Sequence, residues 1–138
     1  MERLLPVVIV LALASAYGLW YRSSRGKVKS SARAKLIALD RKTLGSELGE
    51  RATLVQFSSA FCTPCRMTRT LITDVITDMP DVRHIDIDAE SHLDLVRRLD
   101  IRSTPTTLFL DSSGIERGRA IGAPKRIELI EAINALKA

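Results

Sequence analysis

Cysteine is scarce in this 138-residue chain, which contains only two, Cys62 and Cys65, in a single Cys-x-x-Cys motif. Two cysteines cannot build a disulfide framework for a chain of this length, so the fold must depend on a hydrophobic core. One such motif also supplies only half of a four-cysteine zinc site, and His84 and His92 are spaced more widely than the histidines of a Cys2His2 site. We therefore expect no metal. The sequence has neither a P-loop nor a dinucleotide-binding glycine pattern, so we expect no cofactor.

Acidic residues are missing from residues 22–35, a stretch that contains six basic side chains. The whole chain has a formal charge of +5, but residues 36–138 contain 14 Lys and Arg against 15 Asp and Glu. The positive charge is therefore local, and we expect no nucleic-acid partner. The stretch is also rich in serine, which predicts a flexible linker close to anionic lipid head groups. A solvated spacer without lipid contact is the alternative.

Charged residues are also absent from residues 4–21, an apolar run near the N-terminus. As a helix that rises 1.5 Å per residue, this run would span roughly 27 Å, close to the bilayer core of about 30 Å. Three aromatic side chains lie at its C-terminal end, as interfacial aromatic residues do: Tyr17, Trp20 and Tyr21. The sequence predicts one transmembrane anchor over residues 1–21.

The side of the membrane depends on the six basic residues that follow the apolar run. Positive charge is retained on the cytoplasmic side, so we expect a single-pass protein with its folded domain on the cytoplasmic face. The alternative is a signal peptide cleaved after the small-x-small sequence Ala14-Ser15-Ala16, which would place the domain outside the cytoplasm. Glu2 weakens this alternative, because a signal peptide begins with a positively charged region.

Residues 36–138 alternate between short apolar runs and amphipathic helical patterns, which predicts an α/β fold with helices that cover a sheet. Strands are predicted over residues 36–39, 53–57, 82–88, 106–110 and 115–121. Helices are predicted over residues 41–49, 63–78, 92–99 and 124–136, with Asp40 and Ser91 as N-caps of the first and third. The expected apolar faces are Met67, Leu71, Val75 and Met79 in the second helix and Ile127, Ile130 and Ile133 in the last.

The Cys-Thr-Pro-Cys sequence at residues 62–65 follows a predicted strand and opens a predicted helix. Unpaired backbone N–H groups and the positive end of the helix dipole favour a thiolate there, and we expect the pKa of Cys62 to lie below the usual value of about 8.5. Cys65 comes about one turn later, where its sulfur can reach that of Cys62. Pro64 lies in the first turn, where a missing N–H costs little, and the charge of Arg66 would also favour the thiolate.

The surroundings of this motif resemble the thioredoxin family over residues 36–138. The matching segments, in the order of the family, are the strand and motif at 53–66, the strand at 82–88, the loop with a cis-proline at 101–106, and the glycines Gly114 and Gly122. The resemblance implies a thioredoxin fold, which is a central mixed β-sheet flanked by helices. One transmembrane helix would precede it here.

The resemblance also implies a role for each matching residue. Cys62 would attack a substrate disulfide, and Cys65 would resolve the mixed disulfide and leave the two cysteines joined. Pro105 would be cis and face the cysteines, while Thr104 would offer backbone groups to an extended substrate. In this family the residues between the cysteines, here including Pro64, influence the redox potential.

Three positions depart from the family pattern. Phe61 stands where the family has Trp, and His84 where it has Lys. Gln56 stands where the family has a buried Asp that assists proton transfer at the second cysteine. Because Gln cannot act as a general base, two interpretations of His84 remain. We favour a strand residue without a catalytic role over a histidine that assists proton transfer to Cys65 through water.

Two hypotheses for function follow. In the first, the chain is a membrane-tethered enzyme that reduces protein disulfides through Cys62 and Cys65, with an upstream electron donor as its second partner. In the second, the chain is an adaptor without enzymatic activity, and its thioredoxin fold binds a membrane partner. Turnover of a disulfide substrate distinguishes the two.

Overall fold

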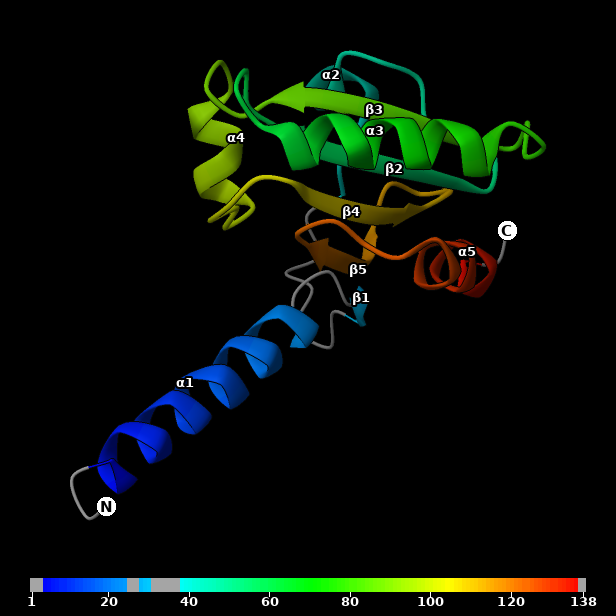
Figure 1. Cartoon of the computed structure of the whole chain (residues 1–138). Coiled ribbons are helices and arrows are strands. Elements are labelled where there is room, and N and C mark those ends of the chain that lie inside the picture. The colour runs from blue at the N-terminus through cyan, green and yellow to red at the C-terminus, as the bar shows by residue number, and fades with distance from the viewer. Residues whose placement is uncertain (1–3, 25–27, 31–37, 137–138) are drawn as a thin grey trace.

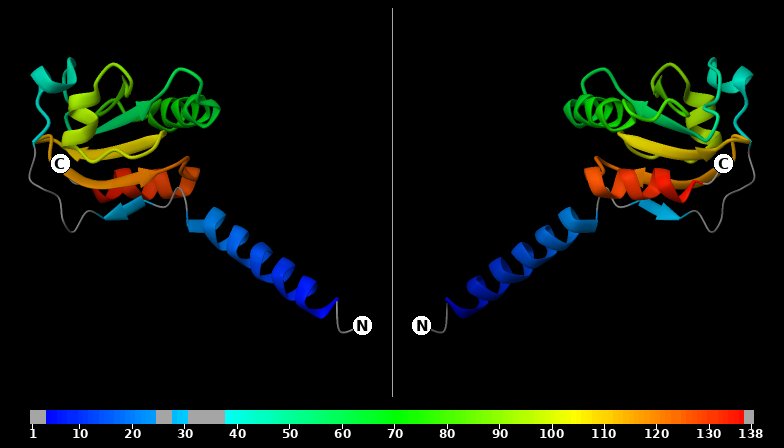
Figure 2. Two further views of the ribbon diagram at one scale, coloured as in Figure 1. Left: turned by 90° about the vertical axis from the view of Figure 1, so that its left-hand side faces the viewer. Right: turned by 90° about the vertical axis from the view of Figure 1, so that its right-hand side faces the viewer.

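The computed structural model describes residues 4–24, 28–30 and 38–136 (Figure 1). The first helix, α1 (Leu5–Ser24), projects away from the rest of the protein, and none of its residues is buried (Figures 1 and 2). Its 20 residues are long and apolar enough to cross a membrane, by length and composition. A signal sequence near an N-terminus has the same properties.

The remaining elements form a five-stranded mixed sheet with helices on both sides. The strands are β1 (Val28–Ser30), β2 (Ala52–Ser58), β3 (Val82–Asp88), β4 (Thr106–Asp111) and β5 (Glu116–Ile121), in the spatial order β1-β5-β4-β2-β3. β2 and β3 are parallel, and the other neighbouring pairs are antiparallel. The predicted fold class is confirmed.

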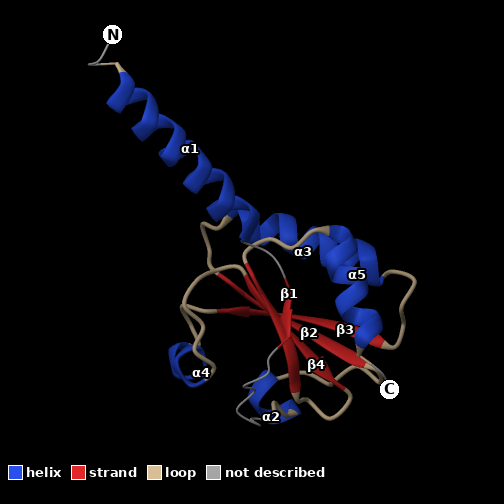
Figure 3. Ribbon diagram, turned by 90° about the horizontal axis from the view of Figure 1, so that it is seen from below, coloured by secondary structure: helices blue, strands red, loops and turns tan. Residues whose placement is uncertain are grey.

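Two helices cover each face of the sheet (Figure 3). The helices are α2 (Arg41–Leu44), α3 (Thr63–Ile76), α4 (Leu93–Arg98) and α5 (Arg126–Ala135). Because side chains alternate along a strand, Val55 and Phe57 of β2 pack with α2 and α4, while Leu54 packs with α3 and α5. We call these two sides the α2/α4 face and the α3/α5 face. Gln56, two residues after Leu54, lies on the α3/α5 face.

The first strand of the domain differs from the prediction. The predicted strand over residues 36–39 lies partly outside the described residues, and Leu39 is a buried core residue outside any strand. The first strand of the sheet is instead β1, which lies within the predicted linker. It forms the sheet edge next to β5, with Val28 opposite Ala120. An edge strand pairs through its backbone groups and does not need a long apolar run. The hydrophobic pattern of the sequence therefore gave no strong signal for β1.

Two helix termini also differ from the prediction. Asp40 is the N-cap of α2, as predicted, and its carboxylate accepts a hydrogen bond from the backbone N of Thr43 at 2.9 Å. The helix then ends after one turn, because Gly45 adopts φ 67°, a left-handed conformation that glycine tolerates. The N-cap of α4 is His92, not Ser91, whose hydroxyl donates to Asp88.

The predicted apolar faces of the two long helices are partly wrong. In α3 the buried residues are Cys65, Thr68, Ile72 and Val75, whereas Met67 is 66% exposed. A four-residue repeat drifts around a helix by about 40° per step, because the helix has 3.6 residues per turn. In α5, Leu129 and Ile133 are buried and Ile127 is exposed. The repeat predicted there has three residues, which drifts by about 60° per step in the opposite sense.

Candidate active site

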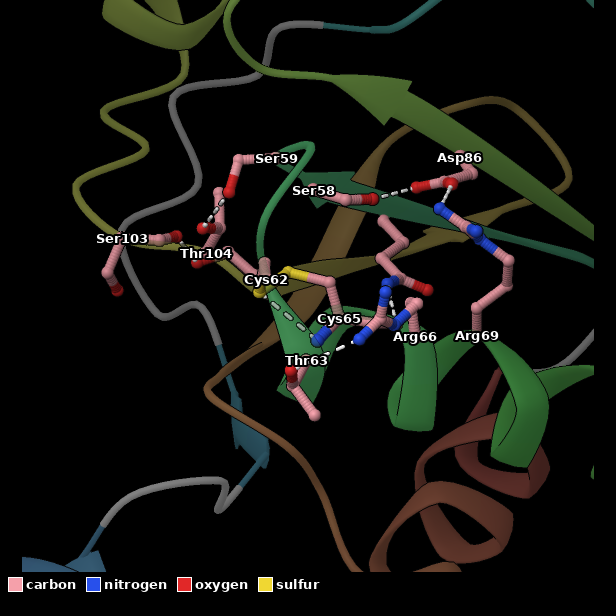
Figure 4. Close-up of a disulfide and its surroundings, with 12 residues drawn as sticks. Ser58, Ser59, Cys62, Thr63, Cys65, Arg66, Arg69, Asp86, Ser103 and Thr104 are labelled. Atoms are coloured by element: carbon pink, nitrogen blue, oxygen red, sulfur yellow. Dashed lines mark hydrogen bonds and ion pairs between the residues drawn. A yellow bond between two sulfur atoms is a disulfide. The ribbon is translucent and has the colours of Figure 1, made fainter.

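The two cysteines form a disulfide at the N-terminus of α3 (Figure 4). Their Cα atoms are 5.2 Å apart, a usual separation for a disulfide. Cys62 is the N-cap residue, and Pro64 occupies the first turn, where proline is expected. Cys62 is partly exposed, whereas Cys65 faces the sheet and is only 1% exposed. The two sulfurs therefore differ in their access to a substrate.

The start of the helix is arranged to stabilise negative charge on the outer sulfur. The backbone N of Cys65 donates to the Cys62 Sγ at 3.1 Å. Because Cys62 is the N-cap of this 14-residue helix, the positive end of the helix dipole also faces its sulfur. Arg66 was predicted to favour the thiolate by its charge. Its guanidinium donates to the hydroxyl of Thr63 at 3.3 Å and not to the Cys62 sulfur.

A second loop lies beside the disulfide and carries the proline singled out by the sequence. The peptide bond between Thr104 and Pro105 is cis, and Pro105 is buried. Its carbonyl accepts a hydrogen bond from Gly122 at 2.8 Å, which ties the loop to the end of β5. The hydroxyls of Ser59 and Thr104 are 3.3 Å apart, so this loop meets the segment before Cys62 (Figure 4). The fold thus brings together the predicted cysteine and proline loops.

Gln56 makes a contact behind the disulfide that the sequence did not predict. Its side chain is fully buried, and its Nε2 donates to the backbone carbonyl of Cys65 at 2.8 Å. His84 contacts Gln56 and not Cys65: its Nε2 lies 3.2 Å from the Gln56 Oε1. Burial lowers the pKa of His84, opposed by the charge of Asp86 and reinforced by that of Arg69.

A polar cluster beside this contact was also missed. Asp86 on β3 accepts a hydrogen bond from Ser58 on β2 and forms an ion pair with Arg69 on α3 (Figure 4). In the sequence these residues are 28 and 17 positions from Asp86. Only the parallel pairing of β2 and β3 and the packing of α3 bring them together. No short motif could have signalled this cluster.

Phe61 is the last of the predicted candidates, and acidic residues lie at the end of β3. Phe61, just before Cys62, is 98% exposed. Asp88 accepts hydrogen bonds from the backbone N of Glu90 and the hydroxyl of Ser91. Within the described ranges, no three His, Cys, Asp or Glu side chains are grouped as metal ligands would be.

Comparisons with known proteins agree with this geometry. The sequence model of the family described as Thioredoxin matches residues 35–135. Thioredoxin H5 of rice (Oryza sativa subsp. japonica) is 30% identical over 63 residues, which are 46% of this chain and 47% of the rice protein. The chain thus matches about half the length of that relative. The thioredoxin of Mycoplasma genitalium is 27% identical over 81 residues, 59% of this chain and 78% of that protein.

Solved structures show the same similarity. The crystal structure of thioredoxin NaTrxh from Nicotiana alata matches with a TM-score of 0.58 and 28% sequence identity, and covers 64% of this chain and 76% of that one. Mitochondrial thioredoxin 3 from Saccharomyces cerevisiae, in its oxidised form, matches with a TM-score of 0.56 and 26% identity, over 63% of this chain and 80% of the yeast chain. The family match over residues 35–135, with a Cys-x-x-Cys disulfide at the start of α3 and a cis-proline loop beside it, shows that this chain belongs to the thioredoxin family.

Proposed function

We propose that this chain is a membrane-tethered protein-disulfide reductase in which Cys62 attacks and Cys65 resolves. The observation that carries the proposal is the unequal exposure of two sulfurs within bonding reach. Cys62 is partly exposed at a helix N-terminus, and Cys65 is almost fully buried beneath it. A substrate disulfide can reach the first sulfur but not the second. The order of the two attacks follows from this difference.

In the first step the Cys62 thiolate attacks one sulfur of the substrate disulfide. The Cys62–substrate bond forms, the substrate disulfide breaks, and the first substrate sulfur leaves and takes up a proton. The backbone N of Cys65 and the start of α3 stabilise the attacking thiolate. Thr104 lies beside Cys62 in the cis-proline loop, where its backbone groups can pair with an extended substrate segment.

In the second step Cys65 attacks the Cys62 sulfur of the mixed disulfide. The Cys62–Cys65 bond forms, and the second substrate sulfur leaves with a proton, so two electrons have passed to the substrate. The joined cysteines of the structure correspond to this end state. A further turnover requires an external electron donor to return the pair to its dithiol form.

The tether in this proposal is α1. Its 20 residues rise about 30 Å, enough to cross a bilayer core, and its side chains are exposed as those of an anchor would be. Three residues separate α1 from β1, so Ser24 and Val28 lie no more than about 15 Å apart along the chain. The domain would then work close to the membrane surface, on the cytoplasmic face that the basic residues favour. A cleaved signal peptide with an exported domain is the alternative.

The test of the chemistry is reduction of insulin disulfides by the full chain in detergent, with dithiothreitol as electron source. Wild type should turn over, Cys62→Ser should not, and Cys65→Ser should accumulate a mixed disulfide visible on a non-reducing gel. His92→Asn, an exposed change away from the disulfide, serves as the matched control. An inactive wild type would support the adaptor hypothesis instead.

The test of the tether and its side uses intact cells. The full chain should remain in the membrane pellet after an alkaline carbonate wash. A membrane-impermeant maleimide should label its cysteines only after the cells are opened. Labelling of intact cells would place the domain outside the cytoplasm, and loss of residues 1–16 on mass spectrometry would identify α1 as a cleaved signal.

A further inference from the structure

Gln56 occupies the position behind the resolving cysteine and is bonded on both sides. Its Nε2 donates to the Cys65 carbonyl at 2.8 Å, and its Oε1 lies 3.2 Å from the His84 Nε2. The residue is fully buried, so water does not compete for these bonds. One side chain therefore links α3, β2 and β3 directly beneath the disulfide.

The chemistry of this link determines where its protons are. A backbone carbonyl only accepts hydrogen bonds, so Gln56 must present its amide nitrogen to Cys65 and its oxygen to His84. The oxygen also only accepts, so the His84 Nε2 must carry a hydrogen, whether the ring is neutral or charged. The nitrogen of His84 that is free to take a proton is Nδ1. The His84 nitrogen that faces Gln56 therefore carries a hydrogen already and cannot accept a proton from the side of Cys65.

The other groups on this face are neutral or paired with each other. Asp86 and Arg69 are the charged side chains that act on His84, and they form an ion pair with each other. From β4, Thr107 lies directly opposite Gln56, and from α3 Thr68 follows Cys65 on the buried side. Both threonines are neutral, and neither hydroxyl has a hydrogen-bond partner within the described part of the chain.

We propose that Gln56 is a positioning residue that, held by His84, keeps the Cys65 peptide in place while the sulfur changes partner. This inference rests on the proposed function and replaces the hypothesis that His84 is a base for Cys65. During resolution the Cys65 proton passes to the departing substrate sulfur without a protein carboxylate or imidazole in between. The pH dependence of the exchange rate should then reflect only the ionisation of the thiols.

The experiment measures the rate of mixed-disulfide resolution by the full chain from pH 5.5 to 9, together with the equilibrium with glutathione. Wild type should show a single inflection, that of the thiols. Gln56→Met, similar in shape but unable to donate, should resolve at least about tenfold more slowly and keep the single inflection, because the Cys65 peptide is no longer held. Gln56→Glu should add a second inflection, because it places an ionisable group at this position.

His84→Gln is the conservative control, because its amide nitrogen can still donate to the Gln56 oxygen. Its rate should stay close to that of wild type at every pH. A second wild-type inflection that disappears in His84→Gln would overturn the inference and make His84 a base. An unchanged rate in Gln56→Met would overturn it as well. If Gln56→Met does not fold, the His84→Gln and wild-type profiles decide, and a wild type without insulin turnover contradicts the proposed function instead.

Discussion

The two faces of the sheet differ in how they use polar side chains. Both faces bury an apolar cluster. On the α2/α4 face the buried threonines bond to nearby loops: Thr53 accepts from the backbone N of Gly49, and Thr106 donates to the carbonyl of Ser103. On the α3/α5 face, Gln56 is bonded to Cys65 and His84, while Thr107 has no partner among the described residues. One face supports the fold, and the other also carries the redox site.

This difference follows from the alternation of side chains along β2. Phe57 and Gln56 are neighbours, yet one side chain enters the apolar cluster under α4 and the other lies beneath the active-site helix. Adjacent residues should therefore give opposite results when they are changed. Changes on either face should affect stability, but only changes on the second face should affect exchange chemistry.

The largest effect is expected from Phe57→Ala. Loss of a fully buried aromatic ring should lower the free energy of unfolding by about 3–5 kcal/mol, measured by urea denaturation. Exchange per folded molecule should not change, because Phe57 faces away from α3. Ile72→Ala on the buried side of α3 is the matched change and should cost about 2–5 kcal/mol. It should also slow exchange, and equal slowing by both variants would contradict the division between the faces.

Replacing the two adjacent threonines of β4 should change the free energy of unfolding in different directions. Thr106→Val removes a 2.7 Å hydrogen bond to Ser103 and should lower the free energy of unfolding by about 1 kcal/mol. Thr107→Val replaces a buried hydroxyl without a partner by a methyl group, and should leave that free energy unchanged or raise it by about 1 kcal/mol. Urea unfolding of the two variants checks both values. A loss of stability in Thr107→Val would mean that its hydroxyl is hydrogen-bonded.

A smaller effect concerns pH. Burial lowers the pKa of His84, with an opposing effect of Asp86 and a further lowering by Arg69. The unfolded chain therefore binds a proton at a pH where the folded chain does not, and the free energy of unfolding should fall as the pH drops through about 6.5. His84→Gln should reduce this slope between pH 7.5 and 5.5, and His92→Asn serves as the control. Equal slopes in wild type and His84→Gln would contradict the shift.

The smallest change in stability is expected at Phe61, which belongs to neither face. Because its side chain is 98% exposed, Phe61→Ala should alter the free energy of unfolding by less than about 0.5 kcal/mol. Its position before Cys62 suggests contact with substrate, so KM for insulin should rise while the rate with a small disulfide stays the same. Steady-state kinetics with both substrates test this. Equal effects on the two would indicate a role in the chemistry of Cys62.

Much of the fold could be read from the sequence because its signals are local. The alternation along β3, the N-cap at Asp40 and the order of strands and helices each depend on neighbouring residues. β1 was missed because three residues on a sheet edge depend on β5, about 90 positions later, for their pairing. The buried side of α3 was misjudged because a four-residue repeat drifts around the helix, and the packing buries Thr68 and Ile72 in place of Met67 and Leu71.

The candidate site divides in the same way. Cys62, Cys65 and the cis-proline loop were predicted from motifs and the resemblance that they carry. The substitution of Gln56 for an acid was also visible, but its contact with the Cys65 carbonyl was not. That contact depends on the register of β2 against β3 and on the packing of α3 over both.

The sequence by itself determined the apolar N-terminal helix, the place of the disulfide and the class of the fold, because each depends on hydrophobic periodicity or on spacing of a few residues. Only the tertiary structure decided which sulfur is buried, and which side chains lie behind it. Those outcomes depend on strand register and helix packing, which join residues tens of positions apart, and no local pattern encodes them.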